Sequence, residues 1–215
     1  MRVAVFASGG GTNLQALLDA CRPPEPAVVA LVVSDKASAG ALERARTSGA
    51  ATAVLTRHDD ANEILGVLRA HDIEFVVLAG YLKLVPADVV DAYAGRMINI
   101  HPALLPSFGG KGMYGRRVHE AVLQSGATLS GPTVHLVSTE YDQGGILAQW
   151  PVPVHREDTA ETLAARVLAV EHQLLPAVVL AAARHGRAAR LLATGGGFAI
   201  EPGSARIGDA LTPAD

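Results

Sequence analysis

The feature that most constrains the fold is the alternation of short apolar segments with amphipathic ones. Four such pairs follow one another, at residues 2–7 and 12–21, 27–34 and 40–49, 75–80 and 86–95, and 96–101 and 115–126. Runs such as FVVLA at 75–79 are apolar at every position, as expected of strands that helices cover on both faces. The alternation therefore predicts an α/β fold, a Rossmann-like doubly wound and mostly parallel sheet.

The carboxyl-terminal part of the chain departs from this rhythm. Two β-like runs, 128–138 and 146–154, flank an acidic, glycine-containing turn, and a helical pattern then extends over 159–183. These runs predict a mixed portion added to the parallel sheet. A chain of 215 residues fits one domain, which we expect at 1–185, followed by a tail at 186–215 that includes a small hairpin.

Composition excludes several classes of protein. The sequence is 49% hydrophobic and 18% charged, which is typical of a compact domain, and its net charge is −3 without a basic, aromatic-rich cluster. Nucleic-acid binding is therefore not expected. No apolar run approaches a membrane span and the amino terminus reaches glycine too early for a signal peptide, so we expect a cytoplasmic protein with no membrane contact. The single cysteine, Cys21, predicts neither a disulfide nor a structural metal.

A glycine-rich turn, SGGGTN at residues 8–13, separates the first predicted strand from the first predicted helix. Backbone N–H groups at the start of a helix favour an anion, and glycines allow a phosphate to approach the main chain closely. The spacing matches neither the dinucleotide fingerprint nor the P-loop, so a monophosphate is the better candidate. A tight turn with an ordinary helix cap remains the alternative.

Polar residues interrupt two of the apolar runs. Asn99 and His101 stand at i and i+2 of one predicted strand, so they project to the same side at the carboxyl edge of the sheet. Asp142 lies in the later acidic turn, and a carboxylate near His101 would raise the pKa of the imidazole. An amide donor, a proton-carrying imidazole and a carboxylate suit a reaction that passes through an oxyanion. Structural roles, a buried spacer histidine and a turn-capping aspartate, remain open.

Five motifs together resemble the phosphoribosylglycinamide formyltransferase family. They are SGGGTNLQALLDA, VVLAGYLKLVP, INIHPALLPSF, GPTVHLVSTEYDQGGILAQ and ARVLAVEHQLLP, they occur in this order, and the match covers about the first 183 residues. The resemblance implies transfer of the formyl group of 10-formyltetrahydrofolate, as co-substrate and without a metal, to the amine of glycinamide ribonucleotide in purine biosynthesis. It implies small-molecule substrates and a monomer or homodimer.

The resemblance also assigns roles to residues. The catalytic positions would be Asn99, His101 and Asp142. The ribonucleotide would contact Gly10, Gly11, Thr12, Asn13 and Glu171. The folate would contact Leu82, Lys83, Leu84 and Val85, mostly through the main chain, with Arg57 as a further candidate. Thr133 and His135 would hold the catalytic residues in position without contacting a substrate.

Two further features bear on the competing interpretations. The glycine-rich loop 107–116 predicts a mobile lid over the folate site. Methionyl-tRNA formyltransferase would need an extra carboxyl-terminal domain and a basic surface, and formyltetrahydrofolate hydrolase would carry a regulatory domain before the first strand; neither is expected here. A nucleotide-binding module without catalysis is the remaining alternative, and the polar trio argues against it.

Overall fold

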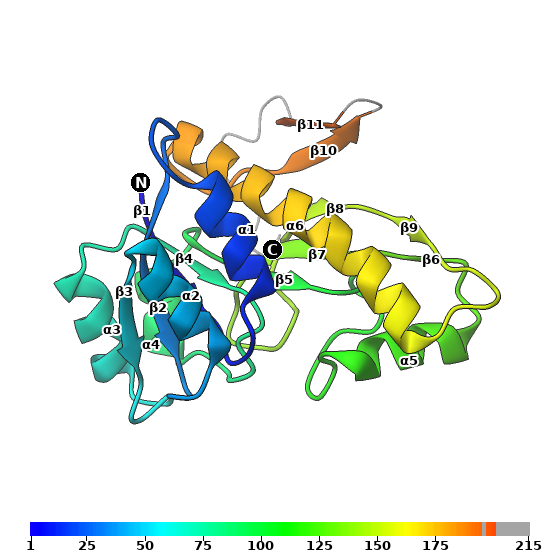
Figure 1. Ribbon diagram of the computed structural model, residues 1–215, viewed down its shortest axis with the longest axis horizontal. Coiled ribbons are helices and arrows are strands. Elements are labelled where there is room, and N and C mark those ends of the chain that lie inside the picture. Colours follow the sequence, from blue (N-terminus) through cyan, green and yellow to red (C-terminus); the bar gives the residue numbers. More distant parts are fainter. Residues whose placement is uncertain (195–196, 201–215) are drawn as a thin grey trace, which may run out of the picture.

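A seven-stranded sheet with the order β3-β2-β1-β4-β5-β7-β8 forms the centre of the molecule (Figure 1). The computed structural model describes residues 1–194 and 197–200. The strands are β1 Arg2–Phe6, β2 Val28–Ser34, β3 Ala51–Val54, β4 Phe75–Leu78, β5 Met97–His101, β7 Thr133–Leu136 and β8 Ile146–Gln149. Strands β1 to β5 pair in parallel, whereas β7 is antiparallel to β5 and β8 to β7. The predicted fold class, including its mixed carboxyl-terminal portion, is confirmed.

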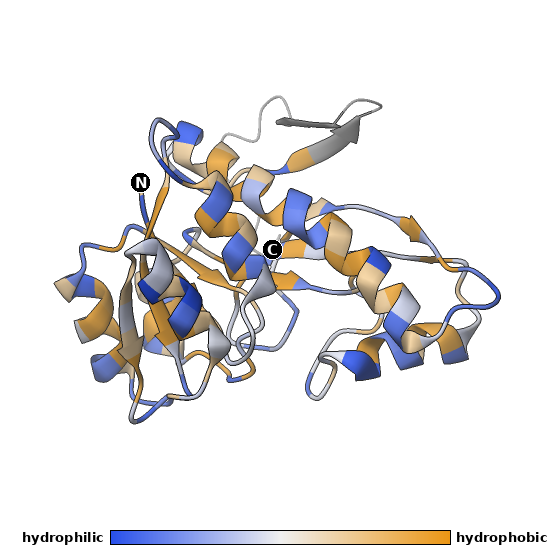
Figure 2. Cartoon of the chain, viewed as in Figure 1, coloured by the Kyte–Doolittle hydropathy of each residue, from blue (hydrophilic) through white to orange (hydrophobic). Residues whose placement is uncertain are grey.

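Helices cover both faces of this sheet. They are α1 Thr12–Ala20, α2 Gly40–Ser48, α3 Ala61–Ala70, α4 Ala87–Ala92 and α6 Ala160–His185, whereas α5 Arg116–Ser125 packs against α6. In β1, Val3 and Val5 pack on one face with α1, α2 and α6, while Ala4 and Phe6 pack on the other with α3 and α4. Burial on both faces explains why the strand sequences do not alternate, and Figure 2 shows these strands in hydrophobic colours.

Helix α6 corrects the expectation that no segment is long and apolar enough to approach a membrane span. It extends over 26 residues with a mean hydropathy of 1.5 over an 18-residue window, so by length and composition it could cross a membrane. The helix instead packs on the sheet: four of its residues are fully buried in the hydrophobic core between the two, namely Leu174, Leu175, Val178 and Val179. The apolar composition of α6 is thus explained by packing, as for the core helix of a globular domain.

Short strands lie outside the main sheet. β6 (Leu129–Ser130) pairs antiparallel with β9 (Val152–Pro153), and β10 (Leu191–Thr194) pairs antiparallel with β11 (Gly197–Ile200). Ala188 belongs to the hydrophobic core, so the beginning of the tail packs against the domain. The rest of the predicted tail, 201–215, lies outside the described residues, and the boundary at residue 185 stays a prediction.

Candidate active site

A cavity of about 630 Å³ opens where β4 and β5 end. On β5, Ile98 and Ile100 face the core under α6, whereas Met97 faces the core beneath α3 and α4. Asn99 and His101 continue the face of Met97 and line the cavity. Its other walls come from the segment 80–85, the loop 110–115, α5 and the amino-terminal half of α6. The prediction that the amide and the imidazole share one side of the sheet agrees with this arrangement.

Asn99 is held by its neighbour on the adjacent strand. Asn99 and His135 lie directly opposite each other in the β5–β7 pair, and Asn99 Nδ2 is 3.0 Å from His135 Nε2. His135 Nδ1 is 2.7 Å from the Leu136 carbonyl oxygen, which only accepts, so Nδ1 donates to it and Nε2 is the ring nitrogen that accepts from Asn99. His135 therefore fixes which end of the Asn99 amide is the donor.

The carboxylate of Asp142 lies between the two histidines. Its Oδ2 is 3.5 Å from His101 Nδ1, and its Oδ1 is 3.6 Å from His135 Nε2 and 3.5 Å from Asn99 Nδ2. The backbone N–H of Gly110 donates to Oδ2 at 2.8 Å. Burial acts to raise the pKa of Asp142, but the neighbouring His135 and His101 rings and the Gly110 N–H outweigh it, so the pKa is lowered and the carboxylate is ionised at neutral pH.

His101 is more deeply buried than we expected for an imidazole that carries a positive charge. The residue is 3% exposed, and its Nε2 lies 2.9 Å from the Phe108 carbonyl oxygen, so Nε2 carries a hydrogen. Burial lowers the pKa of His101 below its ordinary value of 6.5, although Asp142 and the Phe108 carbonyl act to raise it. The expectation of a raised pKa is therefore wrong in its net direction, because desolvation of the ring outweighs the carboxylate.

The three glycines of the turn serve different purposes. Gly11 has φ +75° and precedes α1, and an added Cβ would stand 2.9 Å from Ala41, so the fold itself requires glycine there. Gly9 and Gly10 are exposed, have ordinary φ values, and an added Cβ would meet no atom of the described residues within 4 Å. The packing of the protein leaves these two glycines unexplained, whereas close approach of a ligand would explain them.

The side chains expected to contact the ribonucleotide lie in two places, the cavity and a groove beside it. Asn13 Nδ2 donates to Glu171 Oε2 at 2.6 Å, and both residues line the cavity. Burial raises the pKa of Glu171, which is 6% exposed, against the lowering effect of the Asn13 bond. Thr12 is exposed and faces a shallow groove between α1 and α6. Glu171 thus engages one of the two hydrogens of the Asn13 amide, and contact of Asn13 with the ribonucleotide stays a prediction.

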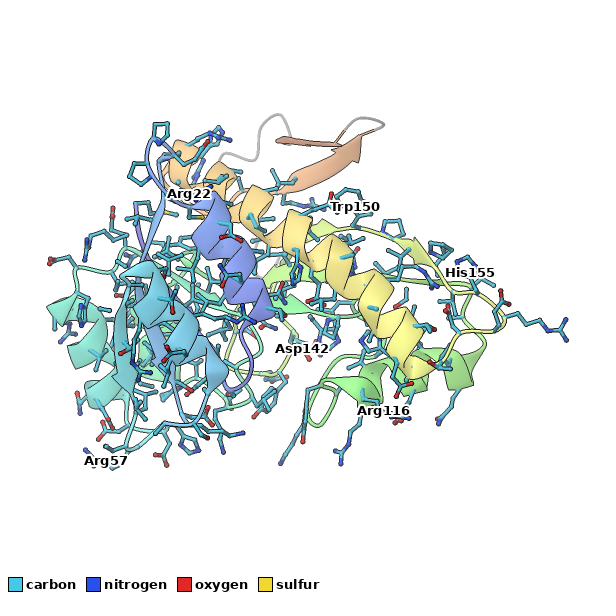
Figure 3. The ribbon with its side chains drawn as sticks, viewed as in Figure 1. Arg22, Arg57, Arg116, Asp142, Trp150 and His155 are labelled. Atoms are coloured by element: carbon cyan, nitrogen blue, oxygen red, sulfur yellow. The ribbon has the colours of Figure 1, made fainter. Side chains whose placement is uncertain are left out.

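All but one of the residues expected to bind folate line the cavity. Leu82, Lys83, Leu84 and Val85 all contribute to its wall, and the side chains of Leu82 and Leu84 are exposed. Arg57 does not reach the described cavity wall: its exposed side chain pairs with Asp60 before α3. Figure 3 shows Arg57 at the edge of the molecule, far from Asp142.

Thr133 supports the loop that follows β5. Its buried hydroxyl donates to the Ala103 carbonyl at 2.7 Å and accepts from Leu105 N–H at 3.0 Å. Gln149 Nε2 also donates to this hydroxyl at 3.0 Å. Thr133 therefore acts on the loop after His101 and is absent from the described cavity wall.

The loop 107–116 covers one side of the cavity. Gly110 ties it to Asp142, and its far end continues into α5, where Arg116 pairs with Glu161 of α6 and with Glu120 at 2.6 Å. Whether the loop moves as a lid stays a prediction.

His119 was not among the predicted residues. It lies on α5, lines the cavity and is 5% exposed, and its Nδ1 is buried without a hydrogen-bond partner among residues 1–194 and 197–200. Burial, with a smaller contribution from His101, lowers the pKa of His119. Its position between Val118 and Val122, on the apolar side of an amphipathic pattern, was the available signal.

In the part of the chain that the structure describes, no group of three or more His, Cys, Asp or Glu side chains is arranged to hold a metal ion.

Comparison with known proteins places the site in a family. Residues 1–179 match the formyl transferase family, and the chain belongs to that family. A chloroplastic phosphoribosylglycinamide formyltransferase of Arabidopsis thaliana is 47% identical over 186 residues, which cover 83% of this chain and 64% of the relative. The Haemophilus influenzae enzyme of the same name is 37% identical, and the match covers 83% of this chain and 85% of that protein. The chain thus spans about two thirds or less of the plant relatives that it matches.

Solved structures agree with the curated relatives. The chain superposes on phosphoribosylglycinamide formyltransferase from Anaplasma phagocytophilum with a TM-score of 0.82 at 38% identity, covering 94% of this chain and 95% of that one. For the Brucella melitensis protein of the same name the TM-score is 0.76 at 45% identity, with coverages of 85% and 95%. The resemblance drawn from the five motifs is confirmed.

Proposed function

We propose that this chain is a phosphoribosylglycinamide formyltransferase. It transfers the formyl group of 10-formyltetrahydrofolate to the amine of glycinamide ribonucleotide, and it releases formylglycinamide ribonucleotide and tetrahydrofolate. The observation that carries the proposal is the meeting of Asn99, His101 and Asp142 in one cavity. The lining of that cavity also includes the largely apolar segment 82–85 and a buried carboxylate, Glu171.

The ribonucleotide binds at the side of the glycine turn. The backbone at Gly10 and Gly11, together with the Thr12 hydroxyl, receives the phosphate at the start of α1, where N–H groups and the helix dipole favour an anion. Glu171 accepts hydrogen bonds from the ribose hydroxyls. Asn13 acts through Glu171, because its amide donates to that carboxylate. The open space at Gly9 and Gly10 supports this placement.

The formylfolate binds against the segment 82–85. Leu82 and Leu84 expose apolar side chains at the cavity, where they pack on the flat ring system, and backbone groups of the segment hydrogen-bond the polar edge of the pterin. The exposure of two large apolar residues beside one cavity supports a ligand that covers them.

The reaction joins the amine nitrogen to the formyl carbon and breaks the bond from that carbon to N10 of the folate. Attack gives a tetrahedral oxyanion, to which the Asn99 amide donates. His101 is neutral at the start because burial lowers its pKa. It accepts the proton that the amine loses and delivers it to N10 as the carbon–nitrogen bond breaks, while Asp142 stabilises the transient imidazolium.

The supporting residues keep this geometry. His135 sets the donor end of Asn99, and Thr133 holds the loop that follows His101. The bond from His101 to the Phe108 carbonyl keeps the ring in place before the substrates bind. We propose a cytoplasmic enzyme, monomer or homodimer, with no nucleic-acid or membrane partner and no metal.

A product assay tests the proposal against its alternatives. The chain is incubated with 10-formyltetrahydrofolate, with and without glycinamide ribonucleotide, and the products are separated by chromatography. Formylated ribonucleotide and tetrahydrofolate in equal amounts are expected only when both substrates are present. Formate released without the ribonucleotide would favour a hydrolase, and binding without product would favour a non-catalytic module. Formylation of methionyl-tRNA, supplied in place of the ribonucleotide in a third incubation, would favour the tRNA enzyme.

A further inference from the structure

We infer that Ser8 is a positioning residue for the formylfolate: it fixes the backbone of the segment 80–85 relative to the glycine turn and so sets the affinity for this substrate. The inference rests on the proposed function. Ser8 itself is absent from the described cavity wall, so it acts through the segment and not by touching the ligand.

The geometry of Ser8 extends the β1–β4 pairing beyond the ends of both strands. Within the sheet Phe6 pairs with Leu78, and the ladder continues with Ala79 N–H donating to the Phe6 carbonyl at 2.9 Å. Ser8 N–H then donates to the Gly80 carbonyl at 3.0 Å. The next donor, Leu82 N–H, is accepted at 3.1 Å by the side-chain Oγ of Ser8. A hydroxyl thus continues the ladder where the chain turns into the glycine loop.

The bonds of Ser8 to Gly80 and Leu82 determine where the backbone of the segment 80–85 lies. Ser8 is 6% exposed, so water cannot easily replace its hydroxyl as the acceptor for Leu82 N–H. Gly80 has φ +74°, a conformation that turns the chain sharply just before the cavity wall begins. The position of the main chain at residues 82–85 therefore depends on the anchor at Leu82.

The consequence concerns binding because the segment recognises its ligand through the backbone. A side chain can adjust its rotamer after a small shift, whereas backbone donors and acceptors lose their geometry together. Ser8 is also the first residue of the turn 8–13, in which Gly10, Gly11 and Thr12 receive the phosphate in the proposed function. One residue thus holds the two substrate-binding segments in register.

The test compares Ser8→Ala with a matched control, Ser34→Ala. Ser34 ends β2 as Ser8 follows β1, it is fully buried, and its Oγ accepts from the Lys36 backbone N–H at 3.1 Å. It has no part in the described cavity wall. Both variants lose one buried hydroxyl acceptor, but only one of the two hydroxyls anchors the folate segment. Calorimetric titration with 10-formyltetrahydrofolate and with glycinamide ribonucleotide gives Kd, thermal unfolding gives Tm, and steady-state kinetics separate KM from kcat.

We expect Ser8→Ala to raise the Kd and the KM for 10-formyltetrahydrofolate about 3- to 10-fold, the range for loss of one hydrogen bond, with a smaller change in kcat and in the ribonucleotide Kd. Ser34→Ala should lower Tm similarly and leave both Kd values unchanged. Should Ser8→Ala fold poorly, Ser8→Cys leaves no cavity, because sulfur is slightly larger than oxygen, but it is a weaker acceptor and should raise the formylfolate Kd about 2- to 5-fold.

Unchanged formylfolate Kd in Ser8→Ala and Ser8→Cys, or an equal rise in Ser34→Ala, would overturn the inference. A wild-type chain that does not bind 10-formyltetrahydrofolate would overturn the proposed function and the inference with it. The two failures are distinguished by the titration of the wild-type chain alone.

Discussion

Replacing Asp142 by asparagine removes the negative charge from the centre of the site and leaves its shape in place. Asp142 has φ +59°, a conformation in which asparagine is also well tolerated, and the amide oxygen can still accept from Gly110 N–H. The fold should therefore survive. What is lost is the interaction of the carboxylate with His101 Nδ1 across 3.5 Å.

The magnitude follows from that distance. Coulomb's law across 3.5 Å gives about 1 kcal/mol in bulk water and about 5 kcal/mol at an effective dielectric constant of about 20. Since the imidazolium is formed only during proton transfer, this stabilisation is lost from the transition state and not from the bound substrates. We expect kcat to fall about 10- to 1000-fold, with small changes in both KM values.

The pH profile supplies a second readout with a definite sign. In the proposed mechanism the neutral form of His101 is the active one, so kcat/KM should fall on the acid side as the pH passes through a His101 pKa that lies below 6.5. Asp142 acts to raise that pKa. Its removal lowers the pKa further, so the acid limb of Asp142→Asn should move to lower pH even though kcat decreases.

The assay is steady-state turnover of both substrates between pH 5 and 9. Glu140→Gln is the control, because Glu140 is an exposed carboxylate in the same turn and its neutralisation should change kcat less than about twofold. A kcat for Asp142→Asn within twofold of wild type, or an acid limb displaced to higher pH, would refute the proton-transfer role.

Three other predictions address the binding residues. Gly11→Ala should reduce the free energy of unfolding, measured by urea titration, by about 2–4 kcal/mol, because Gly11 has φ +75° and an added Cβ would contact Ala41. Gly10→Ala should change the free energy of unfolding by less than about 1 kcal/mol but raise the ribonucleotide KM about 10-fold. The phosphate assignment fails if Gly10→Ala leaves that KM unchanged. Asn13→Ala should raise the pKa of Glu171 further and increase the ribonucleotide KM about 5- to 20-fold with the formylfolate KM constant; the opposite selectivity would contradict the division of the cavity. Arg57→Ala should change the formylfolate KM less than about twofold, and a larger increase would place Arg57 at the ligand after all.

Patterns that depend on local geometry were readable from the sequence. A strand that helices cover on both faces needs apolar residues at every position, so its sequence differs from the periodic pattern of a helix and from the alternating pattern of a half-exposed strand. The side on which Asn99 and His101 lie followed from the two-residue period of a strand. These arguments need only the chain direction and its periodicity.

Properties that arise from tertiary packing were not readable in this way. The direction of the His101 pKa depends on how completely the folded chain excludes water, and that exclusion outweighed the carboxylate from which the sequence argument began. The bond between Asn13 and Glu171 joins residues 158 positions apart, so no local pattern announces it. His119 resembled an ordinary member of an apolar helix face, and only the cavity beside it distinguishes it.

The most direct test of the central claim is a single-turnover experiment with the variant His101→Ala. Excess enzyme, saturated with glycinamide ribonucleotide, is mixed with 10-formyltetrahydrofolate, and formylated ribonucleotide is measured over time beside the Kd of each substrate. The account predicts a transfer rate at least about 100-fold below wild type with both Kd values nearly unchanged. Transfer at the wild-type rate, or a loss explained entirely by weaker substrate binding, would contradict it.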